Sequence, residues 1–472
     1  MIDTDAPPSS ELTTADALRA DLAGAVRGAL AHANGASRIQ HVSVPVPDAI
    51  DPLHWLRVQT GSDRFFWSGR DDAWTEAALG AADVHHITER PLHPERLAAS
   101  IQAALATAEA PVRYYGGARF DAWQSTESPH PDPAWTPFGT ARFVLPRFTL
   151  RHDESGARLL CTLVYPHDTN RADALLKAID ALVFPAPNPD ASLHDLPHPR
   201  RRTDVPGRNG WIKRVRWAVD AIHRNRLSKV VFARRTTLSL NRSPDPIQVL
   251  RHLRPATPGC FHVAMQPGRG PAFIGASPER LFRHNGTTVQ TEALAGTGSR
   301  ADSASADDAL RDALLESDKD RREHAFVQRA IRDALEPLCT SVTADAVEEM
   351  RLARGRHLHA PLTGTLRAGV GTFDLLRALH PTPAVAGVPT DASLSAIRAR
   401  EPFDRGWYAG PMGWIADDAA EFTVAIRSGL IHNRTLALYS GAGLVDGSDP
   451  VKEWDEIEQK ISDFAAILAL SD

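Results

Sequence analysis

Short apolar runs, often rich in β-branched residues, recur along most of the chain and predict β-strands. In the first part of the chain the predicted strands are residues 112–120, 142–151 and 158–165. In the second part they are residues 229–233, 262–266, 272–276, 280–284, 287–294, 412–415, 422–433 and 435–441. The pair Gly116-Gly117 lies inside one of these runs, which indicates a bulge or a close approach of two backbones.

Apolar residues at helical spacing predict helices over residues 11–33, 211–225, 307–338 and 450–470. Asp449 is suited to cap the last of these, and Pro450 then falls in the first turn, where proline is tolerated. Residues 1–10 are expected to form a flexible tail. Residues 185–210 carry six prolines and the basic cluster Arg200-Arg201-Arg202. A solvated connecting loop is the expectation there, and a contact site is the alternative.

Acidic residues extend two of the predicted helical stripes. The first stripe contains Glu316, Asp320, Glu323, Val327, Ala330 and Ala334, and the second contains Glu453, Glu456, Lys460, Phe464 and Ile467. A carboxylate on an inward-facing stripe must be paired or bind a cation, because burying it alone is costly. Oxygen ligands of this kind suit Mg²⁺. The alternative is a set of salt bridges on solvated faces, made with Arg321, Arg322 or Lys452.

Composition narrows the class of protein. The chain has 472 residues, 43% hydrophobic and 24% charged, as folded proteins do, with a net charge of −5. That charge argues against a nucleic-acid or membrane partner. Three cysteines without CxxC spacing argue against a disulfide framework and a cysteine metal site. No apolar run approaches the roughly 18–20 residues of a membrane span. We therefore expect a cytoplasmic protein.

An ordered series of motifs occupies about residues 205–470. The motifs are Lys229-Val-Val-Phe-Ala-Arg234, Phe273-Ile-Gly-Ala-Ser-Pro-Glu279-Arg280-Leu281, Thr291-Glu-Ala-Leu-Ala-Gly-Thr297, Asp318-Lys-Asp-Arg-Arg-Glu-His324, Leu379-His-Pro-Thr-Pro-Ala384-Val-Ala-Gly387, Glu401-Pro-Phe-Asp-Arg405, Trp407-Tyr-Ala-Gly-Pro-Met-Gly-Trp414, Ala425-Ile-Arg427, Gly441-Ala-Gly443 and Glu453-Trp-Asp-Glu456. Together they resemble the chorismate-utilising family of isochorismate, salicylate, anthranilate and aminodeoxychorismate synthases.

The resemblance implies a single large α/β (α+β) fold, with two packed antiparallel sheets surrounded by helices. Residues 205–472 would form the chorismate-binding catalytic region. Residues 11–204 would form the variable N-terminal half, which contributes strands to the same sheets.

The resemblance also assigns binding residues. Mg²⁺ would be held by Glu323 and Glu456, with Asp320 and Glu453 as neighbouring or water-mediated ligands. The carboxylates of chorismate would be bound by Arg427, Lys460 and backbone donors near Gly296, Thr297, Gly441 and Gly443. His357 matches an active-site histidine of the family, although His359 lies only two residues away.

The expected reaction is the conversion of chorismate to isochorismate, in which water adds at C2 and the C4 hydroxyl leaves. Lys229 is the candidate base, because it begins an apolar strand and desolvation favours the neutral amine. Glu279 is the candidate acid, since an apolar pocket favours the protonated carboxyl. Taken without the resemblance, Lys229 would be a surface lysine capping a strand. Glu279 would then be a turn carboxylate paired with Arg280 or Arg283.

Two positions bear on which member of the family this is. Ala384 stands where anthranilate-type members carry threonine, which favours a water-using enzyme. Residues 291–297 look more like an isochorismate synthase than a salicylate synthase, and Glu292 within them is expected to be structural. A salicylate synthase is the alternative enzyme, and a non-catalytic chorismate-binding protein is the alternative of another class. We expect a monomer without an obligate glutamine amidotransferase.

Overall fold

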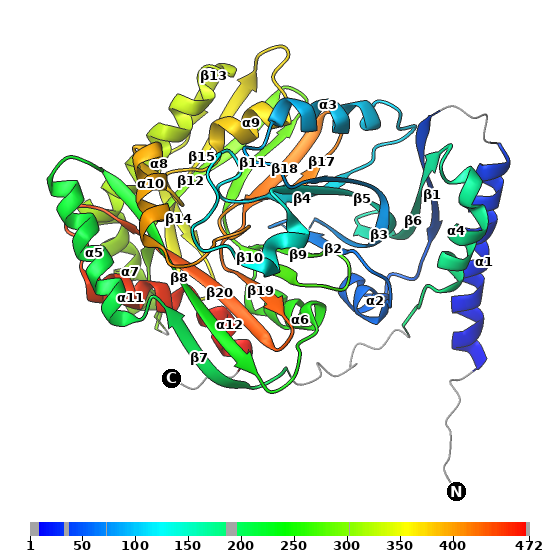
Figure 1. The fold of residues 1–472 in the computed structure, drawn as a ribbon, viewed down its shortest axis with the longest axis horizontal. Helices are drawn as coiled ribbons and strands as arrows, with labels where there is room; N and C mark the ends of the chain where they lie inside the picture. The colour runs from blue at the N-terminus through cyan, green and yellow to red at the C-terminus, as the bar shows by residue number, and fades with distance from the viewer. Residues whose placement is uncertain (1–8, 33–36, 72, 186–195, 302, 469–472) are drawn as a thin grey trace, which may run out of the picture.

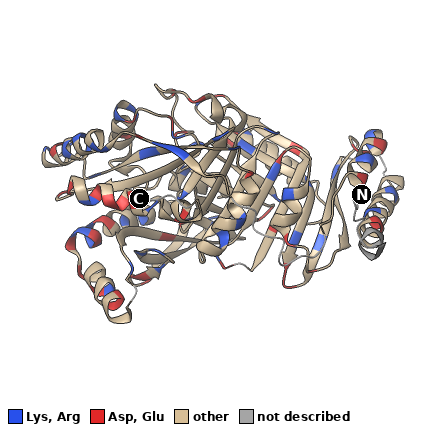
Figure 2. Ribbon diagram, turned by 90° about the horizontal axis from the view of Figure 1, so that it is seen from below, with Lys and Arg blue, Asp and Glu red and all other residues tan. Residues whose placement is uncertain are grey.

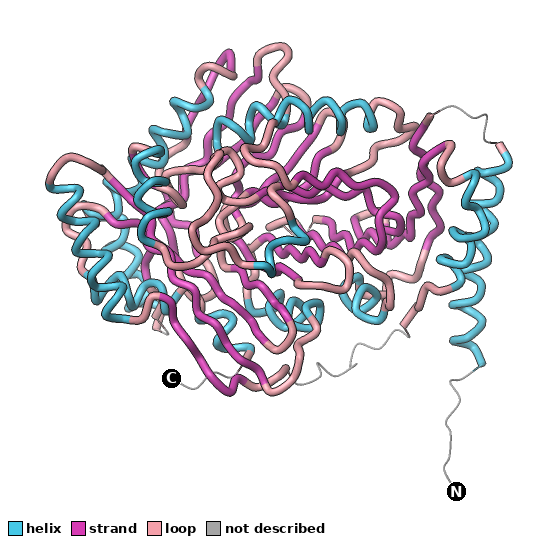
Figure 3. Tube along the Cα trace, viewed as in Figure 1, coloured by secondary structure: helices cyan, strands magenta, loops and turns pink. Residues whose placement is uncertain are grey.

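The computed structural model describes residues 9–32, 37–71, 73–185, 196–301 and 303–468. Strands occupy the middle of the molecule and helices surround them (Figure 3). Two long strands, β3 (Trp74–Ile87) and β5 (Ala141–Asp153), pair with each other and join two arms of sheet. Every strand pair among the described residues is antiparallel. The expected α/β fold of antiparallel strands surrounded by helices is confirmed, but the described strands form one continuous sheet with two arms rather than two separate sheets.

The first arm leaves β5 and the second leaves β3. In order of pairing, the first arm consists of β4 (Tyr114–Ala118), β17 (Pro411–Ile415), β18 (Ala419–Val424), β11 (Arg280–Asn285), β12 (Thr288–Gly298) and β15 (Arg356–Leu366), with β13 (Cys339–Ala344) and β14 (Glu348–Arg351) along its last edge. The second arm consists of β2 (Arg64–Ser68), β9 (Phe261–Gln266), β10 (Ala272–Ser277), β19 (Ser428–His432), β20 (Thr435–Leu444) and β8 (Lys229–Leu240), with β7 (Pro199–Val205) and β16 (Gly387–Val388) at its edge. β6 (Gly156–Tyr165) and β1 (Arg38–Pro45) extend the sheet beyond β5.

The helices lie around the sheet. They are α1 (Ser9–Ala31), α2 (Pro52–Val58), α3 (Pro94–Leu105), α4 (Ala172–Asp180), α5 (Arg208–His223), α6 (Pro246–Ala256), α7 (Ala304–Glu316), α8 (Asp318–Leu335), α9 (Thr372–Leu379), α10 (Thr390–Arg400), α11 (Pro450–Gln459) and α12 (Ser462–Ile467). α8 packs on β12 and β15, while α5, α10 and α11 pack on β8 and β20. At the opposite end of the molecule, α1 and α4 lie side by side next to β1 (Figure 1).

Strands from the N-terminal half pair directly with strands of the catalytic region. β2 pairs with β9, and β4 pairs with β17. A Cβ added to Gly116 of β4 would lie 1.9 Å from the carbonyl oxygen of Arg142, so only glycine fits there. This confirms the close backbone approach expected at Gly116-Gly117. The N-terminal half is therefore part of the same sheet as the catalytic region.

Two of the predicted helices are interrupted. Ser317 separates α7 from α8, because it takes an extended conformation (φ −65°, ψ 113°) and its hydroxyl caps α8. The prediction of one helix over 307–338 is therefore wrong, and Glu316 leaves the acidic stripe. The predicted helix over 450–470 is likewise divided into α11 and α12, while residues 469 and 470 lie outside the described part. The cap at Asp449 is confirmed, since its side chain accepts from the amides of Val451 and Lys452.

Three further expectations need correction. The strand predicted over 422–433 is two strands, because the backbone turns at Arg427. The basic cluster Arg200–Arg202 is not in a loop but on strand β7, which pairs with β8 and keeps these side chains exposed. α5 begins already at Arg208, and residues 186–195 lie outside the described part. Of the predicted tail, residues 9 and 10 belong to α1, and residues 1–8 also lie outside it.

The distribution of charge and the apolarity of the helices bear on the expected partners. Acidic and basic residues alternate over the molecule, without a continuous basic face in this view (Figure 2). Among the helices of the described residues, none is long and apolar enough to cross a membrane.

Candidate active site

The candidate active site is a cavity between the two arms, with about 710 Å³ of empty space including its mouth. Eleven of the residues expected from the sequence line it: Glu279, Gly296, Thr297, Glu323, His357, Ala384, Arg427, Gly441, Gly443, Glu456 and Lys460. The chain crosses between the arms twice here. The link from β10 to β11 carries Glu279, and the link from β18 to β19 carries Arg427. Lys229, Asp320 and Glu453 lie behind the lining.

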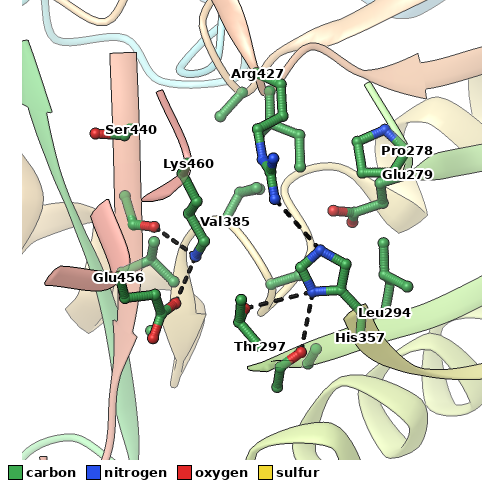
Figure 4. A pocket seen from close by; sticks show the side chains of 18 of the residues that line it. Pro278, Glu279, Leu294, Thr297, His357, Val385, Arg427, Ser440, Glu456 and Lys460 are labelled. Carbon is green, nitrogen blue, oxygen red and sulfur yellow. Dashed lines mark hydrogen bonds and ion pairs between the residues drawn. The ribbon is translucent and has the colours of Figure 1, made fainter. Parts of the chain in front are cut away.

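Arg427 and Lys460 supply positive charge to the cavity (Figure 4). Arg427 NH2 lies 3.4 Å from His357 Nε2, and its NH1 lies 3.4 Å from Asp463 Oδ2. Lys460 Nζ donates to the carbonyl oxygen of Gly441 at 2.8 Å and to Glu456 Oε1 at 2.6 Å. Two cations at one cavity can bind a substrate that carries carboxylates.

Arg427 has a left-handed backbone, with φ +50°. Neighbouring strands hold this conformation. The carbonyl oxygen of Arg427 accepts from the amide of Ala276 at 3.0 Å, and Ser428 Oγ donates to the carbonyl oxygen of Ala425 at 2.9 Å. A non-glycine residue in this region is strained, and such strain concentrates at functional sites. The turn at Arg427 lies between β18 and β19 and directs the guanidinium into the cavity.

His357 is neutral in this setting. Burial, and then the charges of Arg427 and Lys460, lower its pKa to about 3. Its Nδ1 lies 3.0 Å from the carbonyl oxygen of Gly296, so Nδ1 carries the proton and Nε2 faces Arg427 as an acceptor. His359, the alternative in the sequence, does not line the cavity and instead contacts Glu292 at 3.0 Å. Of the two histidines, His357 is the one that reaches the site.

Glu279 lines the cavity and is only 4% exposed. Its backbone is firmly held, since its carbonyl oxygen accepts from Thr423 Oγ1 at 2.6 Å and from the amide of Val424 at 3.1 Å. Burial, and then the charge of Glu292, raise its pKa to about 8 against the opposing charges of Lys229 and Lys460. A carboxyl in this state holds a proton at neutral pH and can donate it.

The simpler interpretation of Glu279, a turn carboxylate in an ion pair, is wrong. Arg280 Nε pairs instead with Glu421 Oε1 at 3.1 Å. Within the described part of the chain, neither Arg280 nor Arg283 forms an ion pair with Glu279.

Lys229 is fully buried at the start of β8, so the interpretation as a surface lysine is also wrong. Its Nζ lies 3.0 Å from Glu323 Oε1, although the angles of this ion pair do not make a hydrogen bond. Gly443 makes room for both side chains. A Cβ there would lie 2.3 Å from Glu323 Oε1 and 2.9 Å from Lys229 Cε. Because Gly443 itself lines the cavity, Lys229 lies directly behind that wall.

The four acids face inward, as the stripe predicts, while Arg321 and Arg322 are exposed. Glu453 is 1% exposed and pairs with Lys319 Nζ at 2.8 Å. Burial, and then the nearby Glu456, raise the pKa of Glu453 to about 7. Burial also raises the pKa of Asp320. Glu453 and Asp320 are therefore crowded and poorly solvated, which disfavours their charged forms.

The arrangement of these four acids determines whether they can hold the expected Mg²⁺. Within the residues that the structure describes, no three carboxylate, imidazole or thiol groups lie close enough together to hold an ion as they stand. Lysines pair with Glu323, Glu453 and Glu456 instead. Nevertheless, Glu453 Oε2 is buried without a hydrogen-bond partner, and the available donors are all carboxylate oxygens. This donor set fits a hard divalent cation such as Mg²⁺.

Sequence reasoning missed part of the lining. Tyr408 and Tyr439 line the cavity and stack on each other, with ring centroids 5.2 Å apart. Burial raises the pKa of both phenols. Tyr408 lies within the motif of residues 407–414 and could have been found there. Tyr439 and Ser440 directly precede the Gly441 motif, but a strand alone gives no sign that they reach the cavity.

Comparisons with known proteins point to one family. A family model for chorismate binding enzymes matches residues 25–469. The chloroplastic isochorismate synthase of Catharanthus roseus is 35% identical over 369 residues, which make up 76% of this chain and 62% of that protein. The salicylate biosynthesis isochorismate synthase of Pseudomonas aeruginosa is 35% identical over 465 residues, or 93% of each chain.

A solved structure extends the similarity to the fold. The menaquinone-specific isochorismate synthase MenF from Escherichia coli superposes with a TM-score of 0.81 at 29% identity, covering 95% of this chain and 99% of that chain. With the family match over nearly its whole length, the chain belongs to the chorismate binding enzyme family.

Proposed function

We propose that this protein is an isochorismate synthase, which converts chorismate to isochorismate in the cavity between the two arms. The observation that carries the proposal is the state of Glu279, a buried carboxyl that lines the cavity and keeps its proton to a pKa of about 8. The names of the similar proteins from Catharanthus roseus, Pseudomonas aeruginosa and Escherichia coli support the same activity.

Binding and chemistry then divide among named residues. Arg427 and Lys460 bind carboxylates of chorismate and orient the ring. Glu279 donates its proton to the C4 hydroxyl, which leaves as water. Lys229 removes a proton from the water that adds at C2, and the double bonds of the ring shift. One water enters and one leaves, so the reaction is an isomerisation. An acid and a base placed in this way each contribute about 10²–10⁴-fold.

Mg²⁺ belongs to the same proposal. Glu323 and Glu456 would hold it, with Asp320 and Glu453 as neighbouring ligands. Bound there, the ion would supply positive charge that binds a substrate carboxylate. The orphaned Glu453 Oε2 supports a cation at this position.

Ala384 also bears on whether the enzyme needs a partner that supplies ammonia. Ala384 contributes only a methyl group to the lining. We propose that water is the nucleophile and that no glutamine amidotransferase is needed to supply ammonia. A salicylate synthase is not favoured, because the similar proteins are named isochorismate synthases.

The test is incubation of the purified protein with chorismate and Mg²⁺, with the products separated by chromatography. Isochorismate without pyruvate or salicylate is expected, and Lys229→Ala or a chelator should abolish it. Salicylate with pyruvate would show a different reaction. An absence of turnover, with or without ammonia, would refute the proposal.

A further inference from the structure

A second buried carboxylate, Glu292, lies next to Glu279 but does not line the cavity. Its two oxygens accept from both terminal nitrogens of Arg70, at 2.8 and 2.9 Å, and Oε2 lies 3.0 Å from His359 Nε2. Burial pushes its pKa upward, but the hydrogen bond from His359 and the charge of Arg70 outweigh burial and hold it at about 2. Glu292 is therefore ionised while its neighbour Glu279 is not.

The Arg70–Glu292 pair also contacts the backbone on both sides of Glu279. Arg70 NH1 donates to the carbonyl oxygen of Pro278 at 2.8 Å. Glu292 Oε1 accepts from the amide of Arg280 at 2.7 Å. One ion pair thus fixes the peptide groups immediately before and after the candidate acid. Bidentate arginine–carboxylate pairs are geometrically specific, so they suit this purpose.

Arg70 comes from the N-terminal half, just after β2, whereas Glu279 and Glu292 belong to the catalytic region. The pairing of β2 with β9 places Arg70 beside the β10–β11 link. Its guanidinium lies 5.7 Å from the centre of the Phe261 ring, which limits its movement. The N-terminal half therefore reaches the site through this residue.

We propose that Arg70 and Glu292 are positioning residues that hold Glu279 in place, and that the charge of Glu292 keeps Glu279 protonated as the acid of the reaction. The inference rests on the proposed function, because it assumes that Glu279 donates a proton. Neither residue lines the cavity, and both contact the backbone on either side of Glu279, through which they act.

The charges around Glu279 predict the direction in which its proton loss should shift in each variant. Glu292 from β12 favours the protonated form, and Lys229 from β8 and Lys460 after α11 favour the ionised form. Tyr408 also faces Glu279, and it is neutral because burial raises its pKa. Removing the charge of Glu292 should shift the proton loss of Glu279 to lower pH. Removing Arg70 takes away the positive charge that offsets Glu292. Glu279 then experiences more of the negative charge of Glu292, so its proton loss should shift to higher pH.

The experiment compares Arg70→Met, Arg70→Lys and Glu292→Gln with the wild-type enzyme, using kcat, KM and the pH dependence of kcat/KM. We expect kcat to fall about 10–100-fold in Arg70→Met with KM changed less than about twofold, and Arg70→Lys to recover part of the loss. The alkaline limb should move down by about one pH unit in Glu292→Gln and upward in Arg70→Met. Arg269→Met, an exposed arginine that donates to the carbonyl oxygen of Thr60, is the matched control and should behave as wild type.

A second comparison separates positioning from folding. In a Glu279→Gln background, Arg70→Lys should cause little further loss of kcat, because the acid it positions is already gone. Equal losses in both backgrounds, or wild-type pH limbs in variants that melt normally, would overturn the inference. If Arg70→Met does not fold, Arg70→Lys and Glu292→Gln decide the question. Wild-type protein without isochorismate formation would refute the proposed function itself, which is a separate result.

Discussion

Lys229 Nζ lies 3.0 Å from Glu323 Oε1, in an ion pair for which Gly443 leaves room. The pair joins the start of β8 to the first turns of α8, two elements from different arms of the fold. It thereby connects the candidate base to a candidate metal ligand. Any change at one of the two residues will be felt by the other, because a buried charge without its partner is strongly destabilised.

Loss of Lys229 should remove the base without removing the cavity. We expect Lys229→Met to lower kcat about 10²–10⁴-fold, since methionine fills a similar volume but accepts no proton. Steady-state kinetics with chorismate measures this. Lys213→Ala, at an exposed position of α5, should keep wild-type activity. Turnover within about twofold of wild type in Lys229→Met would exclude it as the base.

The pKa of Glu279 predicts an alkaline limit of activity. The acid must be protonated, and its pKa is about 8, so kcat/KM should fall about tenfold per pH unit above that value. A pH series of kcat/KM checks this limb. Glu279→Gln should be nearly inactive at every pH. If the residual activity of Glu279→Gln showed the same alkaline limb, that limb would have to come from another group.

Mg²⁺ should bind to the acidic pair of α8 and α11. We expect a chelator to abolish activity and added Mg²⁺ to restore it, because the ion would add to the positive charge of Arg427 and Lys460 that binds the substrate carboxylates. Isothermal titration with Mg²⁺ measures binding directly. Glu456→Gln should weaken it more than tenfold, whereas Asp455→Asn on the exposed side of α11 should not. Equal binding by both variants would place the ion elsewhere.

Asp463 on α12 contacts Arg427, the proposed substrate-binding arginine. Its Oδ2 lies 3.4 Å from Arg427 NH1, and Arg354 Nε lies 3.4 Å from Oδ1. Asp463→Asn should weaken one charge-assisted contact and raise KM for chorismate about fivefold, with a smaller change in kcat. Initial rates over a range of chorismate concentrations measure the two constants separately. A fall in kcat at unchanged KM would argue for a different role.

Two glycines test the packing of the fold. Gly116→Ala should destabilise the protein by about 1–3 kcal/mol, because its Cβ would lie 1.9 Å from a backbone oxygen. Gly24→Ala in α1, with nothing within 4 Å of the added Cβ, should stabilise that helix by up to about 1 kcal/mol. Thermal unfolding of the two variants should move in opposite directions. Similar melting temperatures would contradict the close pairing of β4 with β5.

Part of the local order was predicted from the sequence, because it depends on neighbouring residues, but the long strand β3 was not among the predicted strands. The apolar run at Lys229, the cap at Asp449 and the inward stripe of Glu323 and Glu456 all appear in the structure. Breaks in predicted helices were missed where the side chain of a single residue makes a hydrogen bond with the backbone. Ser317 is compatible with a continuous helix on the wheel, but its hydroxyl caps a new helix instead.

The sequence by itself determined the family, through ordered motifs, and most of the residues that line the cavity. Only the tertiary structure decided how they are arranged. It buried Lys229 behind Gly443, chose His357 over His359 for the cavity, and brought Arg70 of the N-terminal half to Glu292. The physical reason is that burial, ion pairing and the resulting protonation states depend on contacts between strands distant in sequence. Periodicity within one element carries no information about those contacts.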